Sequence, residues 1–258
     1  MSDGSMLDAL IKPSLVYKYR GYSARALEML IQRELYFASP KSLNDPYDCQ
    51  LDIHGALGRA IQKVNNNDYL VKKITGISNV KYLLDKIQND ASNAGVLSFS
   101  TEANNSLMWS HYADSHSGFC VGFNLNDQFN QVDPADNIIG STFVSYDDAD
   151  PYEEYFAGVL SSDDETSFNE FWVTLLGLGM TSKSKAWQYE KEVRVIRKQL
   201  GPVPFDPAML VQVIFGMNMS EHQRDTIKKV LSRSEWNHVK YYQILRADGF
   251  SLKVEELV

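Results

Sequence analysis

Residues that could do chemistry gather late in the chain, in the segment WQYEKEVRV at residues 187–195. If this segment is a strand, Glu190, Glu192 and Arg194 project from one face, because alternate side chains of a strand point to opposite sides. Two glutamates on one face repel each other unless a ligand uses them or Arg194 compensates for their charge. The segment therefore predicts either a pair of catalytic carboxylates or a salt-bridged, solvent-facing strand.

A second group lies near the start of the chain, where the segment VYKYR at residues 16–20 alternates as a strand does. Tyr17 and Tyr19 would share one face, and Lys18 and Arg20 the other. The planar guanidinium of an arginine suits two-pronged contact with a phosphate or a carboxylate. Arg20 is therefore a candidate anion-binding residue, and the alternative is an arginine that simply faces solvent.

The segment MWSHYADSHSGF at residues 108–119 carries a possible acid or base. On a helix, His111 and Asp114 are three residues apart and would share a face. A carboxylate beside an imidazole fixes its tautomer and raises its pKa, as general acid–base catalysis requires. In the alternative interpretation, Trp109 belongs to the core and His111 is merely hydrogen-bonded.

The segment SLNDPYD at residues 42–48 has two carboxylates, Asp45 and Asp48, within a turn signal. Two ligands are fewer than a divalent cation needs, and Asn, Asp and Pro have an obvious use in turn geometry. We therefore favour a structural loop, and no metal site is predicted.

The elements that must position these residues follow from the hydrophobic periodicity. Ser23 is the expected N-cap of the first helix, and SEHQ at residues 220–223 is a capping-box pattern. Strands are predicted at residues 15–20, 35–39, 95–100, 118–123, 138–146, from 192, at 210–215 and at 239–246, and helices at 24–32, within 55–93 with a polar break at 65–68, and at 106–113, 151–160, 166–180 and 220–232. Strands and helices do not alternate as in βαβ units, so this order favours a single α+β domain over residues 1–258, with a mainly antiparallel twisted sheet and flanking helices. Residues 1–13 are poorly patterned.

Composition narrows the function classes. The chain has 258 residues and a net charge of −8, from 25 basic and 33 acidic residues, so broad non-specific binding of nucleic acid is not expected. Cys49 and Cys120 are too few for a disulfide framework. No segment resembles a signal peptide or a membrane span, and a cytoplasmic location is therefore expected.

At these residues the chain resembles a widespread bacterial and prophage family known as domain of unknown function 2971. The resemblance rests on KYR at residues 18–20, LYFASPKSLNDPYD at 35–48, GVLSFS at 95–100, MWSHYADSHSGFCVGF at 108–123 and WQYEKEVRV at 187–195. It extends in order through about residues 15–215. Because this family has no established activity, the resemblance identifies related proteins but does not indicate which reaction the chain catalyses.

The chain is also similar, more weakly, to enzymes that transfer ADP-ribose from NAD. These enzymes often have an arginine on an early strand, a Ser-Thr-Ser-like strand and a late Glu-x-Glu strand. Here Arg20, the segment SFST at residues 98–101 and the segment EKE at residues 190–192 occur in that order. The similarity implies an ADP-ribosyltransferase-like fold with NAD as substrate.

The same similarity implies a role for each residue. Arg20 would neutralise the pyrophosphate, Ser100 would hold the nicotinamide ribose, and Glu192 would stabilise the oxocarbenium-like transition state. Glu190 would orient or deprotonate the acceptor, and His111 could contact the ribose or the acceptor. The remaining candidates for nucleotide binding are Tyr19, Ser98 and an aromatic residue that stacks on nicotinamide, either Tyr36 or Trp109.

Two other functions stay open from the sequence. One is a metal-dependent phosphodiesterase or nuclease that uses Mg²⁺ on Asp45, Asp48, Glu190 and Glu192, with His111 as acid or base. The other is a non-catalytic regulatory module, such as a toxin, antitoxin or phage-defence component, that senses a nucleotide or a protein. The transferase hypothesis requires Arg20, Ser100 and Glu192 to line one cleft.

Overall fold

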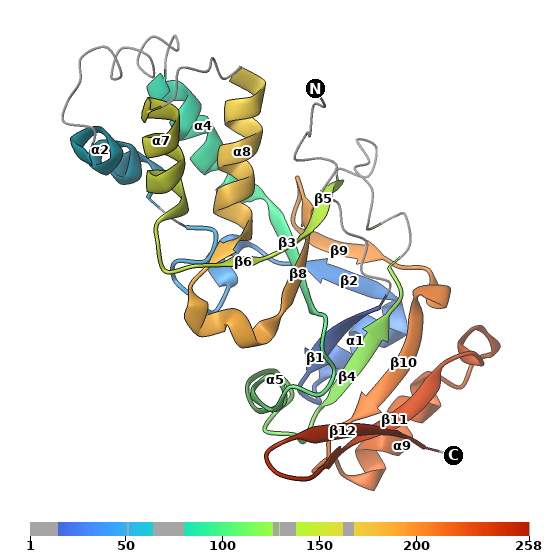
Figure 1. The fold of residues 1–258 in the computed structure, drawn as a ribbon. Helices are drawn as coiled ribbons and strands as arrows, with labels where there is room; N and C mark the ends of the chain where they lie inside the picture. Colours follow the sequence, from blue (N-terminus) through green and yellow to red (C-terminus); the bar gives the residue numbers. More distant parts are fainter. Residues whose placement is uncertain are drawn as a thin grey trace, which may run out of the picture.

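The computed structural model describes residues 15–50, 52–63, 80–125, 129, 138–161 and 168–257 (Figure 1). The predicted stretch at residues 1–13 and the predicted break at residues 65–68 lie outside these ranges. The helices are α1 (Ala24–Gln32), α2 (Ile53–Lys63), α4 (Val80–Asn93), α5 (Ser106–Tyr112), α7 (Pro151–Ser161), α8 (Phe168–Thr181) and α9 (Glu221–Val230), and the short 3-10 helices are η2 (Pro40–Ser42), η3 (Lys185–Glu190), η4 (Pro207–Met209) and η5 (Ser234–Trp236).

An eight-stranded sheet forms the centre of the described structure, in the order β12-β11-β10-β4-β1-β3-β8-β5. Its strands are β1 (Val16–Arg20), β3 (Gly95–Ser100), β4 (Phe119–Phe123), β5 (Ile138–Phe143), β8 (Glu192–Arg197), β10 (Leu210–Phe215), β11 (Lys240–Arg246) and β12 (Leu252–Glu256). Only β10 and β11 pair in parallel within this sheet. Two small sheets pair β2 (Glu34–Phe37) with β9 (Gly201–Pro204) and β6 (Ser145–Tyr146) with β7 (Ser182–Lys183). The mainly antiparallel α+β prediction is therefore confirmed.

The large sheet is split along its middle. β1 pairs with β4 from Val16 to Arg20, and β3 pairs with β8 from Gly95 to Ser100. Between β1 and β3, however, the register aligns one pair, Tyr17 with Ser100. The two halves of the sheet therefore separate beside Lys18 to Arg20, and this separation positions the site described below.

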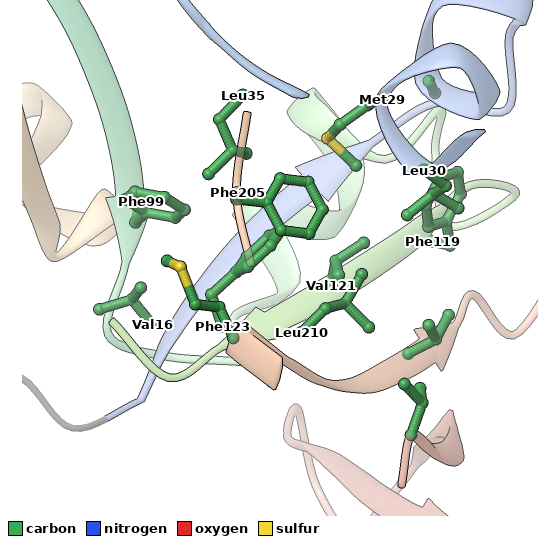
Figure 2. Close-up of a cluster of buried hydrophobic side chains, with 14 of the residues drawn as sticks. Val16, Met29, Leu30, Leu35, Phe99, Phe119, Val121, Phe123, Phe205 and Leu210 are labelled. Atoms are coloured by element: carbon green, nitrogen blue, oxygen red, sulfur yellow. The ribbon is translucent and has the colours of Figure 1, made fainter. Parts of the chain in front are cut away.

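A large hydrophobic cluster covers one side of the sheet and joins its two halves (Figure 2). Val16 and Phe123 of the first half meet Phe99 of the second half there, and Met29 and Leu30 of α1 belong to the same cluster. Helix α1 begins where the sequence predicts, because the Ser23 side chain accepts a hydrogen bond from the Ala26 N–H. The predicted capping box at the start of α9 is likewise present.

Four helices, α2, α4, α7 and α8, gather at one end of the sheet (Figure 1). They share a second cluster of buried side chains that includes Phe156, Phe171 and Leu175. A smaller cluster ties this group to the sheet, since Leu176 and Met180 of α8 pack with Val96 and Ile196. None of the described helices is both long and apolar enough to cross a membrane.

The strand predicted from residue 192 is confirmed as β8, but residues 187–191 do not extend it. Residues 185–190 form η3, which begins where the Ser184 side chain accepts a hydrogen bond from the Ala186 N–H. Lys191 then takes a left-handed conformation with φ 45°, and the strand starts only at Glu192. Glu190 therefore lies outside β8, and the shared strand face considered for Glu190 and Glu192 does not form. The predicted strand at 138–146 is also divided, into β5 and β6.

Candidate functional site

A cleft of about 420 Å³ opens where β1 and β3 separate. Its walls come from β1, the start of α1, β2, the loop after η2, β3, α5, β7, η3 and β8. The residues that line it are Tyr17, Lys18, Tyr19, Arg20, Arg25, Tyr36, Ala38, Ser42, Leu43, Asn44, Asp48, Val96, Ser98, Phe99, Ser100, Met108, Tyr112, Lys183, Glu190 and Glu192. Its volume falls in the range of clefts that bind small molecules and cofactors.

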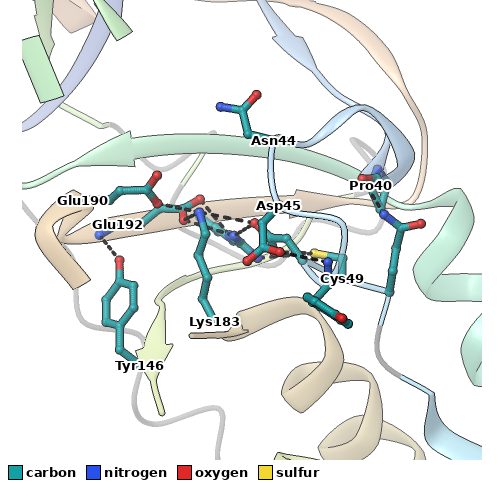
Figure 3. A network of polar contacts seen from close by, with 12 residues as sticks. Pro40, Asn44, Asp45, Cys49, Tyr146, Lys183, Glu190 and Glu192 are labelled. Atoms are coloured by element: carbon teal, nitrogen blue, oxygen red, sulfur yellow. Dashed lines mark hydrogen bonds and ion pairs between the residues drawn. The ribbon is translucent and has the colours of Figure 1, made fainter. Parts of the chain in front are cut away.

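Strand register explains why a serine hydroxyl and a carboxylate meet in this cleft. Ser100 of β3 lies directly opposite Glu192 of β8, and Ser98 lies opposite Arg194. Directly opposed residues of antiparallel strands point to the same face, so all four side chains share one side of the sheet. The backbone N–H of Glu192 also donates to the Tyr146 hydroxyl at 2.8 Å, which fixes the start of β8 (Figure 3).

Arg194 lies beneath the cleft with no exposed surface and holds two carboxylates. Its Nε donates to Glu192 Oε1 at 2.7 Å and its Nη2 to Asp48 Oδ2 at 2.6 Å. Its Nη1 donates to the Met180 carbonyl at 2.7 Å, so every nitrogen of the guanidinium has a partner. Burial alone would raise the pKa of Glu192, but the charge and hydrogen bonds of Arg194, with the charge of Lys183, lower it to about 2.

Lys183 is the second cation of this buried network (Figure 3). Its Nζ lies 2.5 Å from Glu190 Oε2, 3.3 Å from Glu192 Oε2 and 3.4 Å from Asp48 Oδ2. Burial opposes the charged form of Lys183, yet the three carboxylates outweigh this effect and raise its pKa. The network thus joins three acidic groups to two cations, and with all five groups ionised it carries one net negative charge.

Glu190 is held differently from Glu192. The Tyr112 hydroxyl donates to its Oε1 at 2.5 Å, and the Asn44 amide lies 3.4 Å from the same hydroxyl. Burial raises the pKa of Glu190, although Lys183 and Tyr112 both act against this shift. Glu190 is therefore a carboxylate whose proton affinity is increased, next to Glu192, whose proton affinity is decreased. Two such neighbouring groups suit separate acid–base and electrostatic roles.

The opposite wall of the cleft is cationic. Lys18 Nζ donates to the Ser98 carbonyl at 2.8 Å across the split in the sheet and lies 5.3 Å from the centre of the Phe99 ring. Burial and the charge of Arg20 lower the pKa of Lys18, while burial and the charge of Arg25 lower that of Arg20 to about 10. No described carboxylate forms an ion pair with any of these three cations. An anionic ligand would relieve their mutual repulsion.

Seven of the nine residues assigned to the transferase hypothesis line this one cleft: Tyr19, Arg20, Tyr36, Ser98, Ser100, Glu190 and Glu192. The structure thus brings Arg20, Ser100 and Glu192 together, as the transferase hypothesis requires. Their side chains come from β1, β3 and β8, which are far apart in the sequence and adjacent in the sheet.

Trp109 and His111 lie outside the residues that line the cleft. Trp109 has no exposed surface, and its indole N–H donates to the Ala103 carbonyl at 2.8 Å, so it is a core residue and cannot stack on a ligand. His111 is exposed on α5. That helix ends at Tyr112, and Asp114 has a left-handed backbone with φ 50°, so the shared helical face predicted for His111 and Asp114 does not form.

The loop after η2 combines the predicted structural role with one that the sequence did not indicate. Asp45 Oδ1 accepts a hydrogen bond from the Tyr47 N–H at 2.9 Å, as expected of a turn residue. Asp48, considered from the sequence as a turn residue or a metal ligand, instead joins the buried ion network, and Lys183 and Tyr112 were not singled out by the sequence. In the described parts of the chain, no three His, Cys, Asp or Glu side chains form a group that could hold a metal ion.

Residues 108–195 match the model of a family described as "Protein of unknown function (DUF2971)". This match covers about a third of the chain, includes both the Met108–Phe123 and Trp187–Val195 segments, and confirms the predicted family resemblance there. Comparison with curated proteins gave no match. Comparison with solved structures also gave none.

Proposed function

We propose that the cleft binds NAD and that the protein is an ADP-ribosyltransferase-like enzyme, which breaks the bond between nicotinamide and ribose. The observation that carries this proposal is that Arg20, Ser100 and Glu192 line one cleft, although they lie on three different strands. A chance set of short motifs has no reason to meet in this way.

The charges of the cleft support the same proposal. NAD has a negative diphosphate at its centre, and its nicotinamide ribose becomes positive as the glycosidic bond breaks. Lys18 and Arg20 supply cations on one wall, and the floor that contains Glu190 and Glu192 has an excess of negative charge. Preorganised charges aimed at developing charge are the main source of catalytic stabilisation in such sites.

The proposed reaction assigns a separate task to each glutamate. The C1′–N bond breaks, its electron pair leaves with neutral nicotinamide, and the positive charge spreads over the ribose ring. Glu192 stays ionised because of Arg194 and Lys183, and it stabilises that charge electrostatically. An acceptor O–H or N–H then attacks C1′, and its proton passes to the carboxylate of Glu190.

The contacts of Lys183 weigh against the metal-dependent nuclease. Its ammonium group lies within 3.4 Å of Asp48, Glu190 and Glu192, the carboxylates that would otherwise share a Mg²⁺ ion. With Arg194 beside it, most of their charge is already balanced. A lysine in this position therefore supports electrostatic use of the carboxylates rather than their use as metal ligands.

One observation favours a second candidate, a non-catalytic nucleotide-binding module. Arg194 contacts both carboxylate oxygens of Glu192, at 2.7 and 3.0 Å, as in a purely structural ion pair. A regulatory module would use the same cationic wall and the same cleft. The two candidates differ in whether bound NAD is turned over.

The test is the release of nicotinamide from NAD by the purified protein, measured by chromatography with and without EDTA. We expect release that EDTA does not affect, and loss of most of that release in Glu190→Gln, which keeps a hydrogen-bond acceptor for Tyr112. Glu221→Gln, at an exposed position on α9, is the matched control and should keep full activity. Binding of NAD without release would favour the regulatory module, and EDTA-sensitive cleavage of nucleic acid would favour the nuclease.

A further inference from the structure

The three cations of the cleft follow one another outward from the catalytic carboxylates. Tyr17 of β1 pairs with Ser100, which lies opposite Glu192, so Lys18 and then Arg20 follow along β1 away from that carboxylate, and the charges of Lys18, Arg20 and Arg25 act on one another in that order. Lys18 and Arg20 lie on β1, whereas Arg25 lies in the first turn of α1. A dinucleotide with its nicotinamide ribose at Glu192 would therefore place its diphosphate at Lys18 and Arg20, and its adenosine ribose near Arg25.

Arg25 stands where helix electrostatics disfavour a cation. The N-terminus of a helix carries partial positive charge and favours acidic side chains, yet the first turn of α1 contains no acidic residue. Arg25 is held there against the Tyr36 ring, with its guanidinium carbon 4.9 Å from the ring centre. Tyr36 is 44% exposed, and its ring lines the cleft beside this cation. Residues whose charge is unfavourable for their position in a secondary-structure element, such as a cation in the first turn of a helix, are concentrated at functional sites.

The charge count then distinguishes two related ligands. A diphosphate beside Lys18 and Arg20 would raise the lowered pKa of both side chains again and match its two negative charges to them, whereas Arg25 has no ion pair to any described carboxylate and would be left for a further anionic group. We infer that the cleft selects a dinucleotide that carries a third phosphoryl group on its adenosine ribose, so that NADP is preferred over NAD. This inference rests on the proposed function, because it assumes the orientation of a dinucleotide in that cleft.

The experiment compares the binding of two probes that cannot be turned over, ADP-ribose and ADP-ribose 2′-phosphate, by titration calorimetry. We expect the 2′-phosphorylated probe to bind about tenfold more tightly, as for one added charge-assisted contact. In Arg25→Gln the ratio of the two affinities should fall to about one. Arg33→Gln, an exposed arginine just past the other end of α1, is the matched control and should keep the tenfold ratio.

Each other result is decisive. Equal affinities for the two probes in the unchanged protein would overturn the inference, and so would a preference that survives in Arg25→Gln. If neither probe binds, the inference falls together with the binding step of the proposed function. Preference for the phosphorylated probe without nicotinamide release from NAD or NADP would leave the inference standing and overturn only the proposed catalysis.

Discussion

Glu192→Gln tests whether the charge network beneath the cleft has the strength that its contacts imply. A purely catalytic glutamate would tolerate this substitution with almost no change in melting temperature, as the sequence alone suggests. The contacts predict otherwise, because Glu192 is 5% exposed and is paired with Arg194 and Lys183. Removing one partner of a buried ion pair leaves the remaining charges uncompensated.

The pKa of Glu192 sets the magnitude. Its value in the folded protein is about 2, against an ordinary value of 4.5. At about 1.4 kcal/mol for each pKa unit, ionised Glu192 stabilises the folded state by roughly 3 kcal/mol at neutral pH. Because the folded pKa is the lower one, this contribution is complete well above pH 4.5 and is lost as the pH falls toward 2.

The assay is urea unfolding followed by tryptophan fluorescence, at pH 7 and at pH 3, for the unchanged protein and for Glu192→Gln. The difference in unfolding free energy should be roughly 3 kcal/mol at pH 7 and about half of that at pH 3. Glu28→Gln, at an exposed position on α1, is the control and should change stability by less than about 0.5 kcal/mol. A loss below about 1 kcal/mol at pH 7, or one that does not vary with pH, would refute the reasoning.

Three further changes test other parts of the site. Arg20→Ala should weaken NAD binding at least about tenfold in calorimetry without changing the melting temperature, because Arg20 forms no ion pair with a described residue; unaltered affinity would remove it from the site. Tyr112→Phe removes a hydrogen bond that lowers the pKa of Glu190, so the acidic limb of the pH profile of nicotinamide release should move to higher pH, and an unmoved limb would argue against Glu190 as the base. Gly118→Ala should cost at least about 2 kcal/mol in urea unfolding, because its Cβ would overlap the Arg20 carbonyl oxygen, and a neutral result would show that this loop can shift.

Local patterns predicted most of the elements, because alternation and helical periodicity are properties of neighbouring residues. VYKYR forms β1, and the Ser23 cap starts α1, as expected. The same approach failed for residues 187–190, since the turn that starts at Ser184 overrides the alternation of charged residues. It also failed for His111 and Asp114, because α5 ends at Tyr112, two residues before Asp114.

The partners of the candidate glutamates could not be predicted from the sequence. The sequence indicated that Arg194 could compensate for the charge of Glu192, and the two side chains do pair. The second carboxylate that Arg194 contacts is Asp48, which lies 146 residues earlier. Lys183 has no signal of its own in the sequence, because SK in a two-residue strand resembles any surface segment. Such contacts depend on the packing of α8 and of the loop after η2 against the sheet, which no local pattern around the glutamates predicts.

The buried network is better explained by a role in the cleft than by stability. Replacing a buried ion network with apolar side chains of similar volume is often neutral or stabilising, so folding alone gives little reason to keep five charged groups there. The network borders the cleft where β1 and β3 separate, and the same cleft is lined by three cations that have no described carboxylate partner. A ligand with an anionic centre and a sugar that becomes positive would match both walls at once, whereas a neutral or uniformly anionic ligand would match only one. This complementarity is the reason for proposing a dinucleotide as the substrate class, and in that proposal the reacting sugar would lie at the carboxylate end of the cleft.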